Sequence, residues 1–164
     1  IAILSKLGYN VVAISGKKDK INFLKKIGAN EVILRNEFEK ESYKPLLSEK
    51  YAGVVDTVGG KILANALKQV KYDGVVTCCG LTSSQELNTN VFPFILRGIR
   101  LIGIDSVECK LEKKQAGWEK LASRWKISSL NTIINEITLD EIKTAYEHLL
   151  SGKAVGRYVV KIKE

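Results

Sequence analysis

Short apolar runs alternate with stretches of helical periodicity near the start of the chain. Residues 11–14 and 31–34 are apolar and rich in β-branched side chains, which predicts two strands. Between them, residues 21–27 carry apolar side chains at helical spacing, and Gly28 follows where a left-handed residue commonly ends a helix. A strand, a helix and a strand in so short a stretch favour a parallel βαβ crossover.

The same alternation continues to the end of the chain. Further strands are expected at residues 53–56, 74–78, 100–106, 131–137 and 156–162. Helices are expected at residues 1–7, 36–50, 61–70, 91–97, 113–125 and 139–150, with a break near Pro45 in the second and a cap at Thr138 on the last. Strands that alternate with helices favour an α/β fold built on a Rossmann-type doubly wound parallel sheet.

Composition narrows the function classes. The 164 residues are enough for one domain with a real core, and no apolar run approaches the roughly 20 residues of a membrane span, so we expect a cytoplasmic protein. The formal charge of +8 comes from 26 basic residues interleaved with 18 acidic ones, a weaker sign of nucleic-acid binding than a clustered basic stripe. Three cysteines without a CxxC pattern and a single histidine support neither a disulfide framework nor a metal site.

The turn after the first expected strand carries the most informative chemistry. In a dinucleotide-binding fold the end of the second strand meets the adenosine ribose, and NAD-specific proteins place Asp or Glu there. This chain has Ser15, Gly16, Lys17 and Lys18 instead, which suit a negatively charged 2′-phosphate. The alternative is a solvated basic turn, because Ser-Gly-Lys is a common surface tripeptide.

The sequence contains no GxGxxG motif. If residues 11–14 are the second strand of a dinucleotide fold, residues 1–7 are the tail of its first crossover helix. The first strand and its glycine-rich phosphate loop are then expected upstream. Since that strand is central in the order 3-2-1-4-5-6, we expect a gap in the sheet between residues 11–14 and 53–56.

Six segments resemble the medium-chain dehydrogenase/reductase superfamily, in the zinc-independent quinone oxidoreductase branch that includes acryloyl-CoA reductase. They are SGK at 15–17, LKKIGANEVI at 24–33, DTVGG at 56–60, CCGL at 78–81, PFILRGIRLIGIDS at 93–106 and GR at 156–157. Their order and spacing match the family over nearly the whole chain, and the segment at 93–106 is the most specific.

The resemblance implies a two-domain oxidoreductase about twice as long as this chain. Residues 1–130 would form a nucleotide-binding domain that is incomplete at its N-terminus, and residues 131–164 would return to a catalytic domain. The implied activity is NADPH-dependent reduction of an activated C=C bond in a quinone, an enone or an enoyl thioester by hydride transfer. The strand at 100–104 would be a sheet edge through which two copies pair, which implies a homodimer.

The family also implies roles for particular residues. Ser15 and Lys17 would hold the 2′-phosphate, with Gly16 between them and Lys18 as a weaker candidate. The other implied cofactor-binding residues are Thr57, Val58 and Gly59 at one strand end, Cys79, Gly80 and Leu81 at the next, Ile104, Asp105 and Ser106 at a third, and Arg157 late in the chain. The resemblance supplies no proton donor among these residues and no metal ligand.

Simpler explanations exist for several candidates. The glycines at 59–60 can merely start a helix, and the cysteines at 78–79 can be small buried hydrophobes. We expect His148 to be structural. Arg97 and Arg100 could each steady a loop or bind phosphate, and the sequence leaves both options open.

Two rival functions use the same broad features. A methyltransferase also has a doubly wound sheet, but it needs an acidic residue after the second strand for the ribose of its methyl donor, where this chain has Ser15–Lys17. A non-enzymatic nucleic-acid-binding domain would account for the basic charge, but it needs aromatic residues interleaved with a basic stripe, and the aromatics here are scattered.

Overall fold

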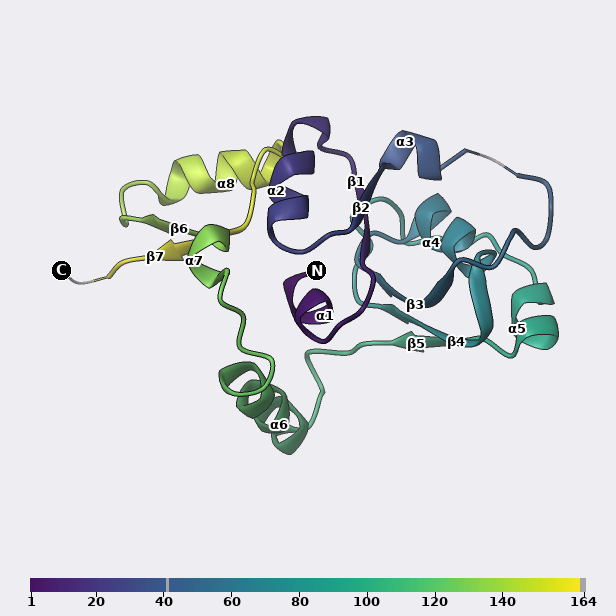
Figure 1. Ribbon diagram of the computed structural model, residues 1–164. Coiled ribbons are helices and arrows are strands. Elements are labelled where there is room, and N and C mark those ends of the chain that lie inside the picture. Colours follow the sequence, from purple (N-terminus) through teal and green to yellow (C-terminus); the bar gives the residue numbers. More distant parts are fainter. Residues whose placement is uncertain (41, 163–164) are drawn as a thin grey trace. The chain divides into compact units, whose positions relative to one another are not determined.

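The computed structural model describes residues 1–40 and 42–162 (Figure 1). Its internal contacts divide the chain into two compact units. The first unit contains residues 1–13, 20–31 and the chain from Trp118 on, and the second contains residues 14–19 and 32–117. Two strands, β1 (Val12–Ser15) and β2 (Glu31–Leu34), pair in a two-stranded sheet. Within the described part of the chain no ladder joins this sheet to another strand, which agrees with the expected gap.

A parallel three-stranded sheet in the order β3-β4-β5 organises the second unit. Its strands are β3 (Tyr51–Asp56), β4 (Val70–Cys78) and β5 (Arg100–Gly103). Val76 in the central strand pairs with Val54 on one side and with Leu101 on the other. Because the strands are parallel, their carboxyl ends lie at one edge of the sheet.

Helix α4 (Gly60–Leu67) supplies much of the core of this unit. One cluster of buried side chains consists of Leu63, Leu67, Val70, Val76 and Ile99, and a second of Phe38, Ile62 and Ala66. The apolar residues at the predicted helical spacing therefore pack as expected, and their burial is the main force that holds α4 in place. The helix ends earlier than predicted, because Val70 already begins β4.

The segment before β3 contradicts the expected helix at 36–50. Only α3 (Arg35–Phe38) forms, and no further helix occurs in the described part of the segment, residues 39–40 and 42–50. The backbone N–H of Leu47 donates to the carbonyl of Lys68, and that of Lys50 donates to the carbonyl of Gln69. These donors are bound to the end of α4 instead of to a helix of their own, and Pro45 has no N–H to contribute.

Two more helices follow in the chain, one within the second unit and one that links the second unit to the first. Helix α5 (Phe92–Arg97) has a proline in its first turn, as predicted, and leads into β5. Strand β5 ends at Gly103, three residues before the expected boundary. Helix α6 (Leu111–Ala122) then carries the chain from the second unit into the first.

The first unit combines short helices with a parallel pair of strands. Its elements are α1 (Ala2–Lys6), α2 (Ile21–Lys26), α7 (Leu130–Ile133), β6 (Ile134–Ile137), α8 (Ile142–Leu150) and β7 (Arg157–Val160), and a 3-10 turn, η1 (Lys18–Lys20), precedes α2. Gly28 ends α2 with φ = +110°, as predicted. The extended segment expected at 131–137 is helical over α7 and becomes a strand only at Ile134.

The predicted pairing of Thr138 with Glu141 before α8 forms, but only one half of a capping box is present. The Glu141 carboxylate accepts hydrogen bonds from the N–H of Thr138 (2.8 Å) and from its hydroxyl (3.0 Å). Thr138 therefore donates its hydroxyl to the carboxylate and does not use it to accept a helix N–H, and the helix starts at Ile142. These two bonds lower the pKa of the Glu141 carboxyl.

Candidate functional site

The carboxyl ends of β3, β4 and β5 bring together three of the predicted groups of cofactor-binding residues. The Cys79 N–H donates to the Asp56 carbonyl (3.1 Å), and the Ile104 N–H donates to the Cys78 carbonyl (2.9 Å). Residues 57–59, 79–81 and 104–106 therefore follow neighbouring strands at the same edge of the sheet. Ligands of open α/β sheets bind at this edge, which makes it the candidate site.

Close backbone packing explains why two of the predicted positions are glycines. A Cβ on Gly80 would lie 2.2 Å from the Thr57 carbonyl oxygen, and a Cβ on Gly59 would lie 2.3 Å from the Ser84 carbonyl oxygen. Gly59 also has φ = +72°, where a side chain is disfavoured. The close neighbour of Gly59 is the loop after β4, and Gly59 and Gly60 also begin α4, as the simpler explanation expected.

The basic turn after β1 has a defined local structure. The Ser15 hydroxyl accepts a hydrogen bond from the Lys17 N–H (3.1 Å), which closes the turn around Gly16. Lys17 is half-buried, whereas Lys18 is exposed at the start of η1. The roles of both lysines toward a 2′-phosphate stay predictions.

Arg35 is a candidate that the sequence reasoning missed. Its guanidinium lies beside the turn, because a Cβ on Gly16 would be 3.5 Å from the guanidinium carbon of Arg35. Arg35 follows β2 directly, so it stands at the end of the strand that pairs with β1. The signal was present in the sequence, since Arg35 comes immediately after a strand whose bounds were predicted correctly.

Several other side chains have structural partners. Arg97 donates to the carbonyls of Lys68 (2.8 Å) and Val70 (3.1 Å), so it steadies the loop and helix ends around it. His148 on α8 shares a 3.0 Å hydrogen bond with the Tyr158 hydroxyl on β7, which supports the structural role expected for it. Arg100 forms an exposed pair with Asp73.

The cysteines divide between two environments. Cys78 is half-buried, and its thiol lies 3.8 Å from the Ile102 carbonyl oxygen. Cys79 is exposed at the candidate site and its thiol lies 3.4 Å from the Asp56 carbonyl oxygen. The simpler expectation of a buried small hydrophobe therefore does not hold for Cys79.

Arg157 belongs to the first unit and donates to the Gly156 carbonyl (2.9 Å). Its implied reach toward a cofactor stays a prediction. Over residues 1–40 and 42–162, no helix is both long and apolar enough to cross a membrane.

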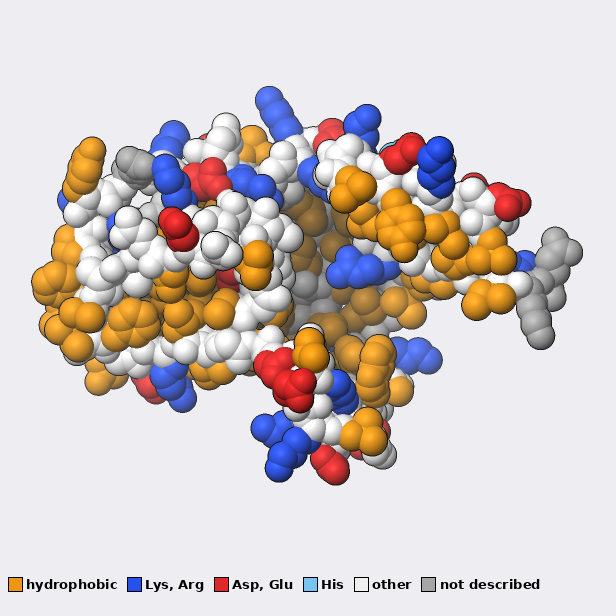
Figure 2. All heavy atoms as spheres, turned by 180° about the vertical axis from the view of Figure 1, so that it is seen from behind, with side chains coloured by type: hydrophobic (Ala, Val, Ile, Leu, Met, Phe, Trp, Pro, Cys, Tyr) orange, Lys and Arg blue, Asp and Glu red, His pale blue; other side chains and the backbone are white. Residues whose placement is uncertain are grey.

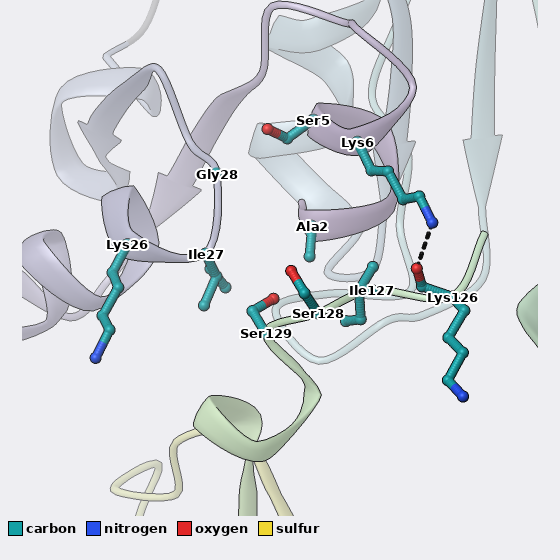
Figure 3. A pocket seen from close by; sticks show the side chains of 10 residues that line it. All are labelled: Ala2, Ser5, Lys6, Lys26, Ile27, Gly28, Lys126, Ile127, Ser128 and Ser129. Atoms are coloured by element: carbon teal, nitrogen blue, oxygen red, sulfur yellow. Dashed lines mark hydrogen bonds between the residues drawn. The ribbon is translucent and has the colours of Figure 1, made fainter. Parts of the chain in front are cut away.

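A separate cavity of about 480 Å³ lies in the first unit (Figure 3). Lys6, which lines it, donates its ammonium to the Lys126 carbonyl. The side chains of Lys26 and Lys126 extend away from the cavity in Figure 3. The basic residues around this cavity therefore do not converge on a common point, and the cavity contributes no argument for an anion site.

Comparison with known proteins identifies the family. A family model of zinc-binding dehydrogenases matches residues 1–125. The chain belongs to this family. It is 40% identical over 163 residues to Putative quinone oxidoreductase YhfP of Bacillus subtilis, and 40% identical over 162 residues to Probable acrylyl-CoA reductase AcuI of Escherichia coli. Each alignment covers 99% of this chain and 49% of the relative, so the chain spans about half the length of these curated relatives.

Solved structures of relatives share the fold. The yhdH oxidoreductase from Salmonella enterica in complex with NADP matches with a TM-score of 0.93 and 40% identity, over 99% of this chain and 49% of that chain. Bacillus subtilis protein yhfP with NAD bound matches with a TM-score of 0.93 and 41% identity, over 98% of this chain and 49% of that chain. These matches confirm the predicted Rossmann-type α/β fold and the membership in the medium-chain dehydrogenase/reductase superfamily.

The family name refers to zinc, an ion that proteins hold through sets of His, Cys, Asp or Glu donors. No group of three or more His, Cys, Asp or Glu side chains among residues 1–40 and 42–162 is arranged to hold a metal ion.

Proposed function

We propose that the chain is the larger part of the nucleotide-binding domain of an NADPH-dependent oxidoreductase that reduces an activated C=C bond. The substrate class is a quinone, an enone or an enoyl thioester of the acryloyl-CoA type. The names of the relatives YhfP and AcuI and the NADP bound to the Salmonella enterica protein support this proposal. We propose residues 1–130 as the nucleotide-binding domain and residues 131–164 as a return to the catalytic domain.

The basic turn is the single observation that carries the cofactor assignment. Ser15 offers a hydroxyl, Lys17 and Lys18 offer ammonium groups, and the Arg35 guanidinium lies beside Gly16. A 2′-phosphate carries between about one and two negative charges and accepts charge-assisted hydrogen bonds from such groups. No Asp or Glu stands at Ser15–Lys18 to accept a hydrogen bond from a 2′-hydroxyl, so we propose a preference for NADPH over NADH.

When bound, the nicotinamide supplies the hydride that reduces the β-carbon of the activated double bond, and a proton then neutralises the enolate. The residues of this chain position the cofactor relative to the substrate. We propose that Thr57, Val58 and Gly59 line the cofactor crevice. Cys79, Gly80 and Leu81 then lie toward the nicotinamide end, together with Ile104, Asp105 and Ser106, and Arg157 reaches toward the cofactor.

We propose a homodimer that pairs through the strand at 100–104. Within the second unit, β5 pairs with β4 on one side and is an edge of the three-stranded sheet, so its outer backbone groups are free to pair with another chain. Exposed apolar side chains also occur on α5 and on β5, for example Ile95 (68% exposed) and Ile102 (43% exposed). Figure 2 shows hydrophobic side chains gathered at the surface of the second unit. A strict monomer in sedimentation of the full-length protein would contradict this proposal.

A cytoplasmic location also belongs to the proposal. The three cysteines are free in the structure, which suits a compartment that keeps thiols reduced.

Enzyme assay of the full-length protein tests the activity. We expect NADPH to be consumed when acryloyl-CoA, a short enone or a benzoquinone is added, and the saturated or hydroquinone product to appear. Binding of NADPH without turnover of any of the three would contradict the assignment of the substrate class. Saturable binding of S-adenosylmethionine, or a salt-sensitive shift of labelled RNA, would instead support one of the rival functions.

A further inference from the structure

Asp56, at the carboxyl end of β3, is the one buried carboxylate among the residues that the structure describes. It is 4% exposed. Burying a carboxylate is unfavourable unless hydrogen bonds replace those it made with water. The hydrogen-bond partners of Asp56 therefore indicate the role of its side chain.

The partners of Asp56 all belong to the candidate site. Its carboxylate accepts a hydrogen bond from the Gly59 N–H (2.9 Å), which closes the turn over residues 57–58. Its main-chain carbonyl accepts the N–H of Cys79 (3.1 Å), from the loop after the next strand. One residue therefore fixes the turn after β3 and ties that turn to the turn after β4.

The rest of the turn is held just as closely. The Val58 carbonyl accepts the N–H groups of Ser83 (2.8 Å) and Ser84 (3.3 Å), and Gly59 forms a parallel bridge with Ser84. A Cβ on Gly59 would lie 2.3 Å from the Ser84 carbonyl oxygen, so the two loops pack too closely here to admit a side chain. If the Asp56 carboxylate no longer held the Gly59 N–H, the backbone of residues 57–59 would lose one of the hydrogen bonds that fix it.

We propose that Asp56 is a positioning residue for the dinucleotide: its carboxylate holds the Gly59 amide and so presets the backbone of residues 57–59 in the cofactor crevice. This inference rests on the proposed function. Asp56 acts through the turn and does not itself touch the cofactor. Its loss is expected to weaken cofactor binding and to leave the chemical step at saturating cofactor nearly unchanged, since hydride transfer belongs to the cofactor.

The test compares variants of the full-length protein by titration with NADPH and by steady-state kinetics. In Asp56→Ala the turn loses its acceptor, and we expect the Kd for NADPH to rise at least tenfold while kcat at saturating NADPH changes less than threefold. Asp56→Asn keeps an oxygen that can accept the Gly59 N–H, and we expect its Kd to stay within threefold of the original protein. Asn90→Ala is the matched control, because Asn90 accepts the Phe92 N–H (3.0 Å) in a similar but exposed turn.

Thermal unfolding of each variant separates positioning from folding. If Asp56→Ala does not fold, Asp56→Val replaces it, because a side chain of similar size leaves a smaller cavity at this buried position and still removes the acceptor. An unchanged Kd in whichever of these two variants folds would overturn the proposal, and so would an Asp56→Asn variant as weak as Asp56→Ala. Failure of the original protein to bind NADPH would instead refute the proposed function.

Discussion

The guanidinium carbon of Arg35 lies 3.5 Å from the position that a Cβ on Gly16 would occupy. Arg35 follows β2, and the basic turn follows β1, the strand that pairs with β2. Arg35 therefore adds a planar, permanently charged guanidinium to the groups that Ser15 and Lys17 offer. A guanidinium can bind a phosphate through two parallel hydrogen bonds, which a lysine cannot do.

Arg35→Ala is therefore expected to lower the affinity of the full-length protein for NADPH about tenfold, or roughly 1.4 kcal/mol, and to leave the affinity for NADH within threefold. Fluorescence titration with both nucleotides measures the effect, and Lys113→Ala on exposed α6 serves as a charge-matched control. Equal losses of affinity for NADPH and for NADH would show that Arg35 maintains the conformation of the turn and does not bind the 2′-phosphate.

Lys17→Glu reverses a charge within the turn itself. We expect it to weaken NADPH binding at least tenfold, about 1.4 kcal/mol or more, because a carboxylate there repels the 2′-phosphate. The same titration measures the change. Unchanged affinity would reassign Lys17 to the general surface.

Arg97→Ala tests the structural assignment of a residue whose role the sequence left open. The side chain is 12% exposed, donates to the carbonyls of Lys68 and Val70, and pairs with Glu49 (3.4 Å). Its removal takes one donor from the Val70 carbonyl, leaves the Lys68 carbonyl with the Leu47 N–H, and ends the pair with Glu49. We expect a loss of about 2–4 kcal/mol in the free energy of unfolding. Chemical denaturation measures it.

The matched control is Arg100→Ala. The side chains of Arg100 and its partner Asp73 are 57% and 73% exposed, so their pair is screened by water and we expect a change below about 0.5 kcal/mol. Similar losses for the two variants would contradict the role given to Arg97.

The cap of α8 makes one contribution to stability depend on pH. Hydrogen bonds from the Thr138 N–H and hydroxyl favour the charged form of Glu141 and lower the pKa of its carboxyl from 4.5. The stabilisation is therefore fully present above about pH 4.5 and is lost as the pH falls through the lower pKa of the folded state. NMR titration of the Glu141 carboxyl measures this pKa. Thr138→Val, which removes only the hydroxyl, is expected to raise it partway, and no change would exclude the hydroxyl as a cause.

Local patterns predicted the elements that a few neighbouring residues specify. The strand at 31–34 and the end of α2 at Gly28 were predicted correctly, because alternation and a left-handed glycine are properties of a few neighbouring residues. The helix expected at 36–50 was wrong, because the N–H groups of Leu47 and Lys50 bind carbonyls about 20 residues later in the sequence. No periodicity in the segment itself reports such partners.

The candidate site divides in the same way. Residues at strand ends could be predicted, because parallel strands place their carboxyl ends together. The place of Arg35 after a strand was predictable, but the position of its guanidinium beside Gly16 was not, because it depends on the side-chain conformation. The role of Asp56 depends on its burial and on its hydrogen bond to Gly59, which the sequence does not show.

Competitive titration of the full-length protein with NADPH and NADH tests the central claim most directly. The account predicts that NADPH binds at least tenfold more tightly, since only NADPH presents a phosphate to Ser15, Lys17 and Arg35. Equal affinity, or tighter binding of NADH, would contradict it.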